Sequence, residues 1–114
     1  MTTYLNSNKI EDLCNEIGQE NLPVLLNIFL GELNSYHVSL TENGDNLERL
    51  LSDISHALKS SAASFGADDL CRKALHIDAK AKAGEKVSTA ENRNSLLDSI
   101  EATIRAYGAL YQAK

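Results

Sequence analysis

One histidine stands out because the helix predicted around it turns its apolar side chains the other way. At about 100° per residue, a helix from Leu47 places its apolar residues within about 60° of one direction. These residues are Leu47, Leu50, Leu51, Ile54, Leu58, Ala62 and Phe65. His56 falls at roughly 180° from them, among mostly small neighbours, with Lys59 one turn later. The sequence therefore predicts an exposed, uncrowded imidazole beside a cation, which is what a phosphoryl-accepting histidine needs.

The chemistry open to such a histidine is phosphoryl transfer. A neutral imidazole has a ring nitrogen free to attack phosphorus, and the protein mainly supplies positioning and charge neutralisation. Lys59 is within reach of a phosphate on His56, and Ser60 could donate a hydrogen bond to a phosphate oxygen. One exposed charge pair is worth only about 1 kcal/mol in water, which is far too little to drive phosphorylation from ATP.

Motifs for other kinds of active site are missing. The six glycines are isolated, and no serine, cysteine or carboxylate pair is framed as a hydrolytic centre. His37 and His76 fall on other predicted helices without i, i+4 partners, so we expect surface or boundary histidines and no metal site. Cys14 and Cys71 have no metal or redox spacing, and we expect small, buried apolar residues in the reducing cytoplasm.

Length and composition indicate one all-α domain covering residues 1–114. The chain is 43% hydrophobic, has one proline, and carries a 3.6-residue period over long segments. Its net charge of −5 favours a protein or small-molecule partner over nucleic acid or an anionic membrane. Residues 72–82 are basic but are interrupted by Asp78, and look like an ordinary solvated helix face. No secretory signal begins the sequence, and the most apolar stretch, residues 22–30, is too short to span a bilayer.

Five helices are predicted, running from about Lys9 to Glu16, Leu22 to Leu40, Leu47 to Gly66, Asp68 to Lys82, and Ser88 to Tyr111. The predicted N-terminal caps are Asn8, Asn21, Asp45 and Ser88, with Glu11, Glu48 and Glu91 completing three capping boxes. Gly66 is expected to end the third helix in a left-handed conformation. Because the connections are short, we expect an up-down antiparallel four-helix bundle with a short additional N-terminal helix.

Inward-facing residues are predicted for each long helix. For the second, fourth and fifth helices they are Leu22, Leu25, Leu26, Phe29, Leu33, Tyr36, Leu40, Leu70, Ala74, Ile77, Ala81, Leu97, Ile100, Ile104, Tyr107 and Tyr111. Val24 and Ile28 lie off this pattern. Either the first helix packs over them, which we favour, or they form a docking patch for a partner. Gly31 sits in mid-helix, where glycine costs about 1 kcal/mol relative to alanine, with no evident reason.

The residues from His56 to Ala67, followed by Leu70 and Cys71, resemble the histidine-containing phosphotransfer (HPt) family. The family pattern is His, any residue, Leu, Lys, Gly or Ser, Ser or Ala, then small residues up to a glycine, here Gly66. Ser60 stands where many members have glycine. Residues 23–26 and 28–32 extend the resemblance to members that serve quorum sensing.

The resemblance implies a monomeric phosphocarrier of a two-component phosphorelay, without kinase activity of its own. His56 would accept a phosphoryl group from a receiver-domain aspartate of a hybrid sensor kinase and pass it to a response-regulator aspartate. Lys59 would lie beside the phosphate, and the receiver would supply Mg²⁺, so the chain needs no cofactor of its own.

Two alternatives remain. Residues 55–59 also resemble the phosphoacceptor helix of sensor histidine kinases, but Ala57 and Ser61 replace the usual acidic residue and proline, and no ATP-binding region follows. The second alternative is a helical adaptor that binds a partner without chemistry. In an adaptor, His56→Gln should leave signalling intact, whereas in a phosphocarrier it should abolish signalling.

Overall fold

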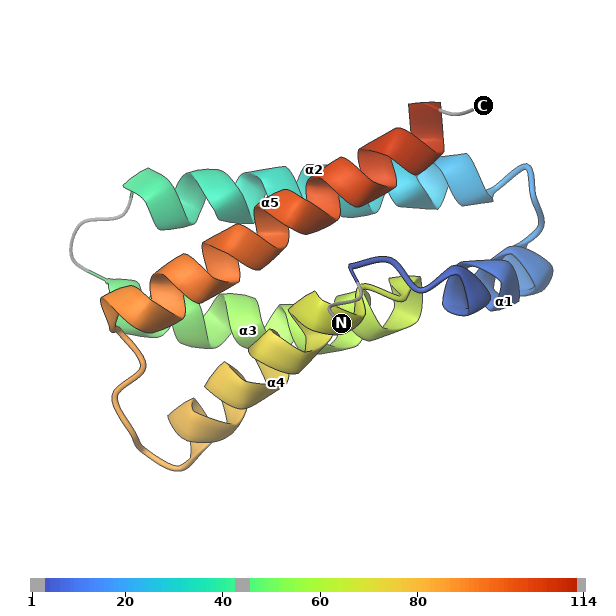
Figure 1. Ribbon diagram of the computed structural model, residues 1–114. Helices are drawn as coiled ribbons and strands as arrows, with labels where there is room; N and C mark the ends of the chain where they lie inside the picture. Colours follow the sequence, from blue (N-terminus) through green and yellow to red (C-terminus); the bar gives the residue numbers. More distant parts are fainter. Residues whose placement is uncertain (1–3, 43–45, 113–114) are drawn as a thin grey trace.

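Four long antiparallel helices form a bundle, and a shorter helix lies at one end of it (Figure 1). The computed structural model describes residues 4–42 and 46–112, without the side chains of residues 110–112. In these ranges the helices are α1 (Ser7–Ile17), α2 (Leu22–Glu42), α3 (Leu47–Phe65), α4 (Asp68–Lys82) and α5 (Ala90–Gln112). Each long helix packs on two other long helices: α3 lies against α2 and α4, and α5 lies against α4 and α2. The predicted all-α bundle with a short N-terminal helix is confirmed.

The core lies where the apolar faces of these helices meet. An aromatic cluster occupies one end: the Phe29 and Phe65 rings stack at 4.4 Å, and Tyr107 meets Phe29 edge-on at 5.5 Å. The inward faces agree with the sequence pattern for α2 to α4, although six of the predicted residues are only partly buried: Leu25, Tyr36, Leu47, Leu50, Phe65 and Ala81. In α5, Leu96, Ser99 and Thr103 are buried in addition to the predicted Leu97, Ile100 and Tyr107. The predicted Ile104 is only partly buried, and Tyr111 lies outside the described side chains. No helix in the described ranges is long and apolar enough to cross a membrane.

The turn between α3 and α4 is held from several sides. Gly66 has φ +78°, and the N–H groups of Gly66 and Ala67 donate to the carbonyls of Ala63 and Ala62 at 3.3 and 2.8 Å, which closes the helix end. The Tyr107 hydroxyl donates to the Phe65 carbonyl at 2.5 Å. These bonds fix how α4 leaves α3, and therefore which of their residues face each other.

α1 is anchored on this same turn. The Asn6 N–H donates to the Gly66 carbonyl at 2.7 Å, and the Asn6 side-chain amide donates to Asp68 at 2.9 Å. Asn6, and not the predicted Asn8, caps α1, because the helix begins at Ser7 and the Asn6 side chain accepts from the N–H groups that follow.

Three other predicted caps differ or cannot be assessed. The Asn21 side-chain amide donates to the Ile17 carbonyl at 2.7 Å and so serves the end of α1. Thr89 replaces Ser88 at the start of α5, since its hydroxyl accepts from the Asn92 N–H at 3.0 Å. Asp45 lies outside the described residues.

Glu48 has a different role from the predicted capping box. Its carboxylate accepts from the N–H groups of Val87 and Ser88 at 2.9 to 3.0 Å. The start of α3 is thereby joined to the loop before α5. This bond holds Ser88 in the loop, which is why α5 begins two residues later than predicted.

The exposed face of α2 corrects another interpretation. Val24 and Ile28 are 59% and 62% exposed, so α1 does not cover them. The reason is the anchoring of α1 on Gly66, which carries it to the α3–α4 turn. Gly31 lies on the same exposed side of α2, and a Cβ added there would meet nothing within 4 Å.

Two glycine substitutions should have opposite effects on stability. A Cβ at Gly66 would lie 2.7 Å from the Lys9 Cβ and 2.9 Å from the Asn6 carbonyl oxygen, in a conformation that costs other residues about 1–2 kcal/mol. We expect Gly66→Ala to lower the free energy of unfolding by at least that amount. Gly31→Ala should raise it by about 0.5–1 kcal/mol. Urea unfolding of both variants checks this, and a stable Gly66→Ala protein would contradict the packing of α1 on the turn.

Candidate functional site

His56 lies in the middle of α3, on the side that faces away from the bundle. Its side chain is 65% exposed, whereas Ile54 and Leu58, on the opposite side of the helix, are buried. Ala57 and Ser60 beside it are exposed and small. The ring is therefore accessible to another protein from outside the bundle.

A buried carboxylate from the neighbouring helix touches this ring. Asp78 of α4 is only 5% exposed, and its Oδ1 lies 3.3 Å from His56 Nδ1. Its Oδ2 accepts from Lys59 Nζ at 2.9 Å and lies 3.1 Å from Lys82 Nζ. Because a buried charge is costly unless it is paired and hydrogen-bonded, these three groups are what allows a carboxylate at this position.

The ammonium groups keep Asp78 ionised. The hydrogen bond from Lys59, more than any other contact, lowers the pKa of Asp78 to about 2, and Lys82 and His56 act in the same direction against the effect of burial. An ionised carboxylate only accepts hydrogen bonds. The contact therefore favours the tautomer of His56 with the proton on Nδ1. The lone pair then lies on Nε2, the ring nitrogen farther from Asp78.

The predicted site residues are only partly brought together. Lys59 lies beside His56, but its side chain is 23% exposed and its charge is already paired with Asp78. Ser60 is exposed on the same side of α3, and its role stays a prediction. Gly66 is ten residues beyond His56, about 15 Å along the helix, so its part is to fix the turn to α4.

Asp78 and Lys82 were not identified as site residues from the sequence. The prediction of a solvated face over residues 72–82 is wrong at Asp78, which is buried between α4 and α3. A signal was present: Asp78 follows Ala74 by four residues and so shares the inward direction of α4, and Lys82 follows Asp78 by another four. The partners of Asp78 on α3, which are His56 and Lys59, could not be identified without knowing how the two helices pack.

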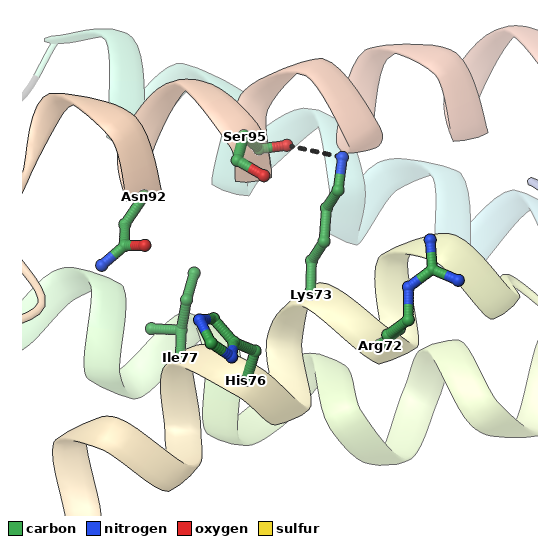
Figure 2. Close-up of a pocket in the computed structure, with 6 residues that line it drawn as sticks. All are labelled: Arg72, Lys73, His76, Ile77, Asn92 and Ser95. Carbon is green, nitrogen blue, oxygen red and sulfur yellow. Dashed lines mark hydrogen bonds between the residues drawn. The ribbon is translucent and has the colours of Figure 1, made fainter. Parts of the chain in front are cut away.

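The other two histidines have different surroundings. His76 lines a cleft of about 250 Å³ between α4 and α5 (Figure 2). Because His76 comes two residues before Asp78, the two side chains lie on different sides of α4. The two cations that line this cleft form ion pairs with one carboxylate: Arg72 and Lys73 lie 2.6 and 3.4 Å from the buried Asp69. His37, on α2, lies 3.6 Å from Glu101 of α5. No group of three or more His, Cys, Asp or Glu that could hold a metal occurs in the part of the chain that is described.

Asp78 should make stability depend on pH in acid. Its pKa of about 2 in the folded protein lies below the unfolded value of about 3.9, so its contribution is fully present above about pH 4 and is lost as pH falls through about 2. We expect Asp78→Asn to lower Tm most above pH 4, with a difference from wild type that shrinks towards pH 2. Asp53→Asn, an exposed carboxylate 3.7 Å from Arg49, is the control and should follow the wild type. A difference that stays constant from pH 2 to 6 would contradict the role assigned to Asp78.

Comparison with known proteins shows the family of this chain. The Hpt domain family profile matches residues 24–106. The chain is 47% identical to the phosphorelay protein LuxU of Vibrio cholerae serotype O1 over 112 residues, covering 96% of this chain and 98% of the relative. It is 51% identical to LuxU of Vibrio harveyi, covering 93% and 94%, and 50% identical to LuxU of Vibrio vulnificus strain YJ016, covering 90% of each. No solved structure gives a significant match. The matched region contains His56 and both helices that form its surroundings, and the chain belongs to the Hpt domain family.

Proposed function

We propose that His56 carries a phosphoryl group between aspartates of receiver domains in a phosphorelay. The observation that carries this proposal is the contact between His56 Nδ1 and Asp78 at 3.3 Å on a ring that is 65% exposed. It gives an accessible nitrogen with a lone pair and a fixed ring orientation. Membership of the Hpt family and the similarity to phosphorelay proteins named LuxU support the same chemistry.

The accepting step begins at Nε2. Its lone pair attacks phosphorus of the receiver's aspartyl phosphate, the new N–P bond forms, and the P–O bond to the aspartate breaks. The aspartate leaves as a carboxylate with the bonding electron pair. The ring keeps its proton on Nδ1 and becomes positively charged, and the carboxylate of Asp78 stabilises that charge.

The donating step is the reverse reaction with a second receiver aspartate. The attacking carboxylate displaces Nε2 from phosphorus, and the ring returns to its neutral form. Asp78 keeps the ring oriented throughout, which is the positioning that transfer through a loose, in-line transition state requires. The receiver would supply Mg²⁺, because Asp78, the carboxylate that contacts His56, is already bound to Lys59 and Lys82.

The chain's own residues do not supply a kinase reaction. Lys59 and Lys82 neutralise charge, but neither is part of a nucleotide-binding loop. We therefore assign a phosphocarrier that is charged and discharged by receiver domains of a hybrid sensor kinase and a response regulator. A quorum-sensing relay in the cytoplasm, with the chain acting as a monomer, completes the proposal.

A helical adaptor remains the second candidate because α2 exposes Val24 and Ile28. An exposed apolar surface of this kind would serve binding in an adaptor and in a phosphocarrier alike. An adaptor, however, has no need for an ionised carboxylate buried against the ring of His56 and shared with two lysines. The arrangement of Asp78 therefore favours the phosphocarrier.

Incubation with phosphorylated receiver domains tests the proposal. The wild-type protein should acquire one phosphate that is stable in base and labile in acid, and should acquire none from ATP and Mg²⁺ alone. His56→Gln should remove the label, because the attacking nitrogen is lost. His37→Gln and His76→Gln, the matched controls on α2 and α4, should be labelled like the wild type. Labelling of His56→Gln, or no labelling of the wild type by any receiver, would contradict the proposal.

A further inference from the structure

The surroundings of His56 carry an excess positive charge before any phosphate arrives. Asp78 supplies one negative charge and is bound by two ammonium groups, those of Lys59 and Lys82. With a neutral imidazole the cluster therefore has one net positive charge. A doubly charged phosphoryl group on a positively charged ring adds one net negative charge, so phosphorylation would bring the cluster to neutrality.

The two lysines are not equivalent. Lys59 has a side chain that is 23% exposed and lies 2.9 Å from Asp78 Oδ2. Lys82 lies 3.1 Å from the same oxygen, but its side chain is 60% exposed, at the C-terminal end of α4. A lysine on a flexible four-carbon stem with this exposure is free to change partner, whereas Lys59 is held between the helices.

Phosphorylation of the His56 ring would change the partners that Asp78 needs. When His56 accepts a phosphoryl group, its Nδ1–H becomes part of a cation and binds Asp78 more strongly. Asp78 then has two cationic partners without Lys82. The new phosphoryl oxygens are carried on Nε2, the ring nitrogen farther from Asp78, and Lys82, bound to the second oxygen of the carboxylate that contacts this ring, must leave that oxygen to reach them.

We propose that Lys82 moves from Asp78 to the phosphoryl group when His56 is phosphorylated, and so stabilises the phosphorylated state. This inference rests on the proposed function of His56 and adds a second cation, from α4, to the site. Lys82 forms and breaks no covalent bond in this exchange. Lys59 remains on Asp78 and holds the carboxylate against the ring.

The experiment measures how strongly the protein holds a phosphoryl group in the absence of a partner. Potassium phosphoramidate phosphorylates imidazole and releases ammonia, so the occupancy of His56 at fixed phosphoramidate and ammonia concentrations gives an equilibrium constant. Intact-mass spectrometry reads the occupancy, and His56→Gln corrects for other sites. We expect Lys82→Gln to lower the constant about fivefold, the factor that corresponds to about 1 kcal/mol for one exposed ion pair.

Two further variants separate this role from a structural one. Lys82→Arg should restore the constant, because the guanidinium keeps the charge. Lys80→Gln, a lysine of α4 two residues away and on the other side of the helix, should leave it unchanged. Thermal unfolding of the Lys82 and Lys80 variants should be close to that of wild type, since Lys82 is largely exposed and Asp78 keeps its contacts with Lys59 and His56.

Each outcome decides the question. An equal constant in Lys82→Gln and wild type would overturn the inference and leave the proposed function intact, because His56 would still be labelled. An equal fall in Lys80→Gln would also overturn it, by showing an effect of net charge alone. Absence of label on His56 in the wild type would overturn the proposed function, and this inference with it.

Discussion

A single carboxylate buried between two helices organises the exposed side of α3. Asp78 is almost without access to solvent, and it is tolerated because Lys59, Lys82 and His56 surround it. Its contacts hold Lys59 and the ring of His56 in place, whereas the more exposed Lys82 binds it from the surface. The chemistry of the accessible histidine thus depends on a residue that is itself buried.

The position of Asp78 depends in turn on how α4 leaves α3. The left-handed Gly66, the Tyr107 hydroxyl on the Phe65 carbonyl and Asn6 on the Gly66 carbonyl together fix that turn. α3 and α4 then pack along each other more extensively than any other pair of described helices. The N-terminal helix therefore contributes to the site from a distance, by supporting the turn and without approaching His56.

Periodicity was sufficient for much of this structure, because helix positions and inward faces follow from spacing along one segment. The exposure of His56 and the helix end at Gly66 could be predicted for that reason. Contacts between segments could not be predicted from spacing along one segment. Glu48 binds a loop 39 residues later in preference to capping its own helix, and Asp78 meets partners on α3 only through the relative rotation of two helices. The exposed Val24 and Ile28 were misjudged for the same reason, since the docking position of α1 is a tertiary property. The monomeric state and the cytoplasmic location stay predictions.

Asp78 keeps the proton of His56 on Nδ1 and leaves Nε2 free to react. Long-range ¹H–¹⁵N correlation spectra of the ring at pH 8 measure this directly. We expect a protonated-type resonance for Nδ1 and an unprotonated-type resonance for Nε2, with the preference lost in Asp78→Asn. A ring protonated on Nε2, or the same tautomer mixture in wild type and Asp78→Asn, would contradict it.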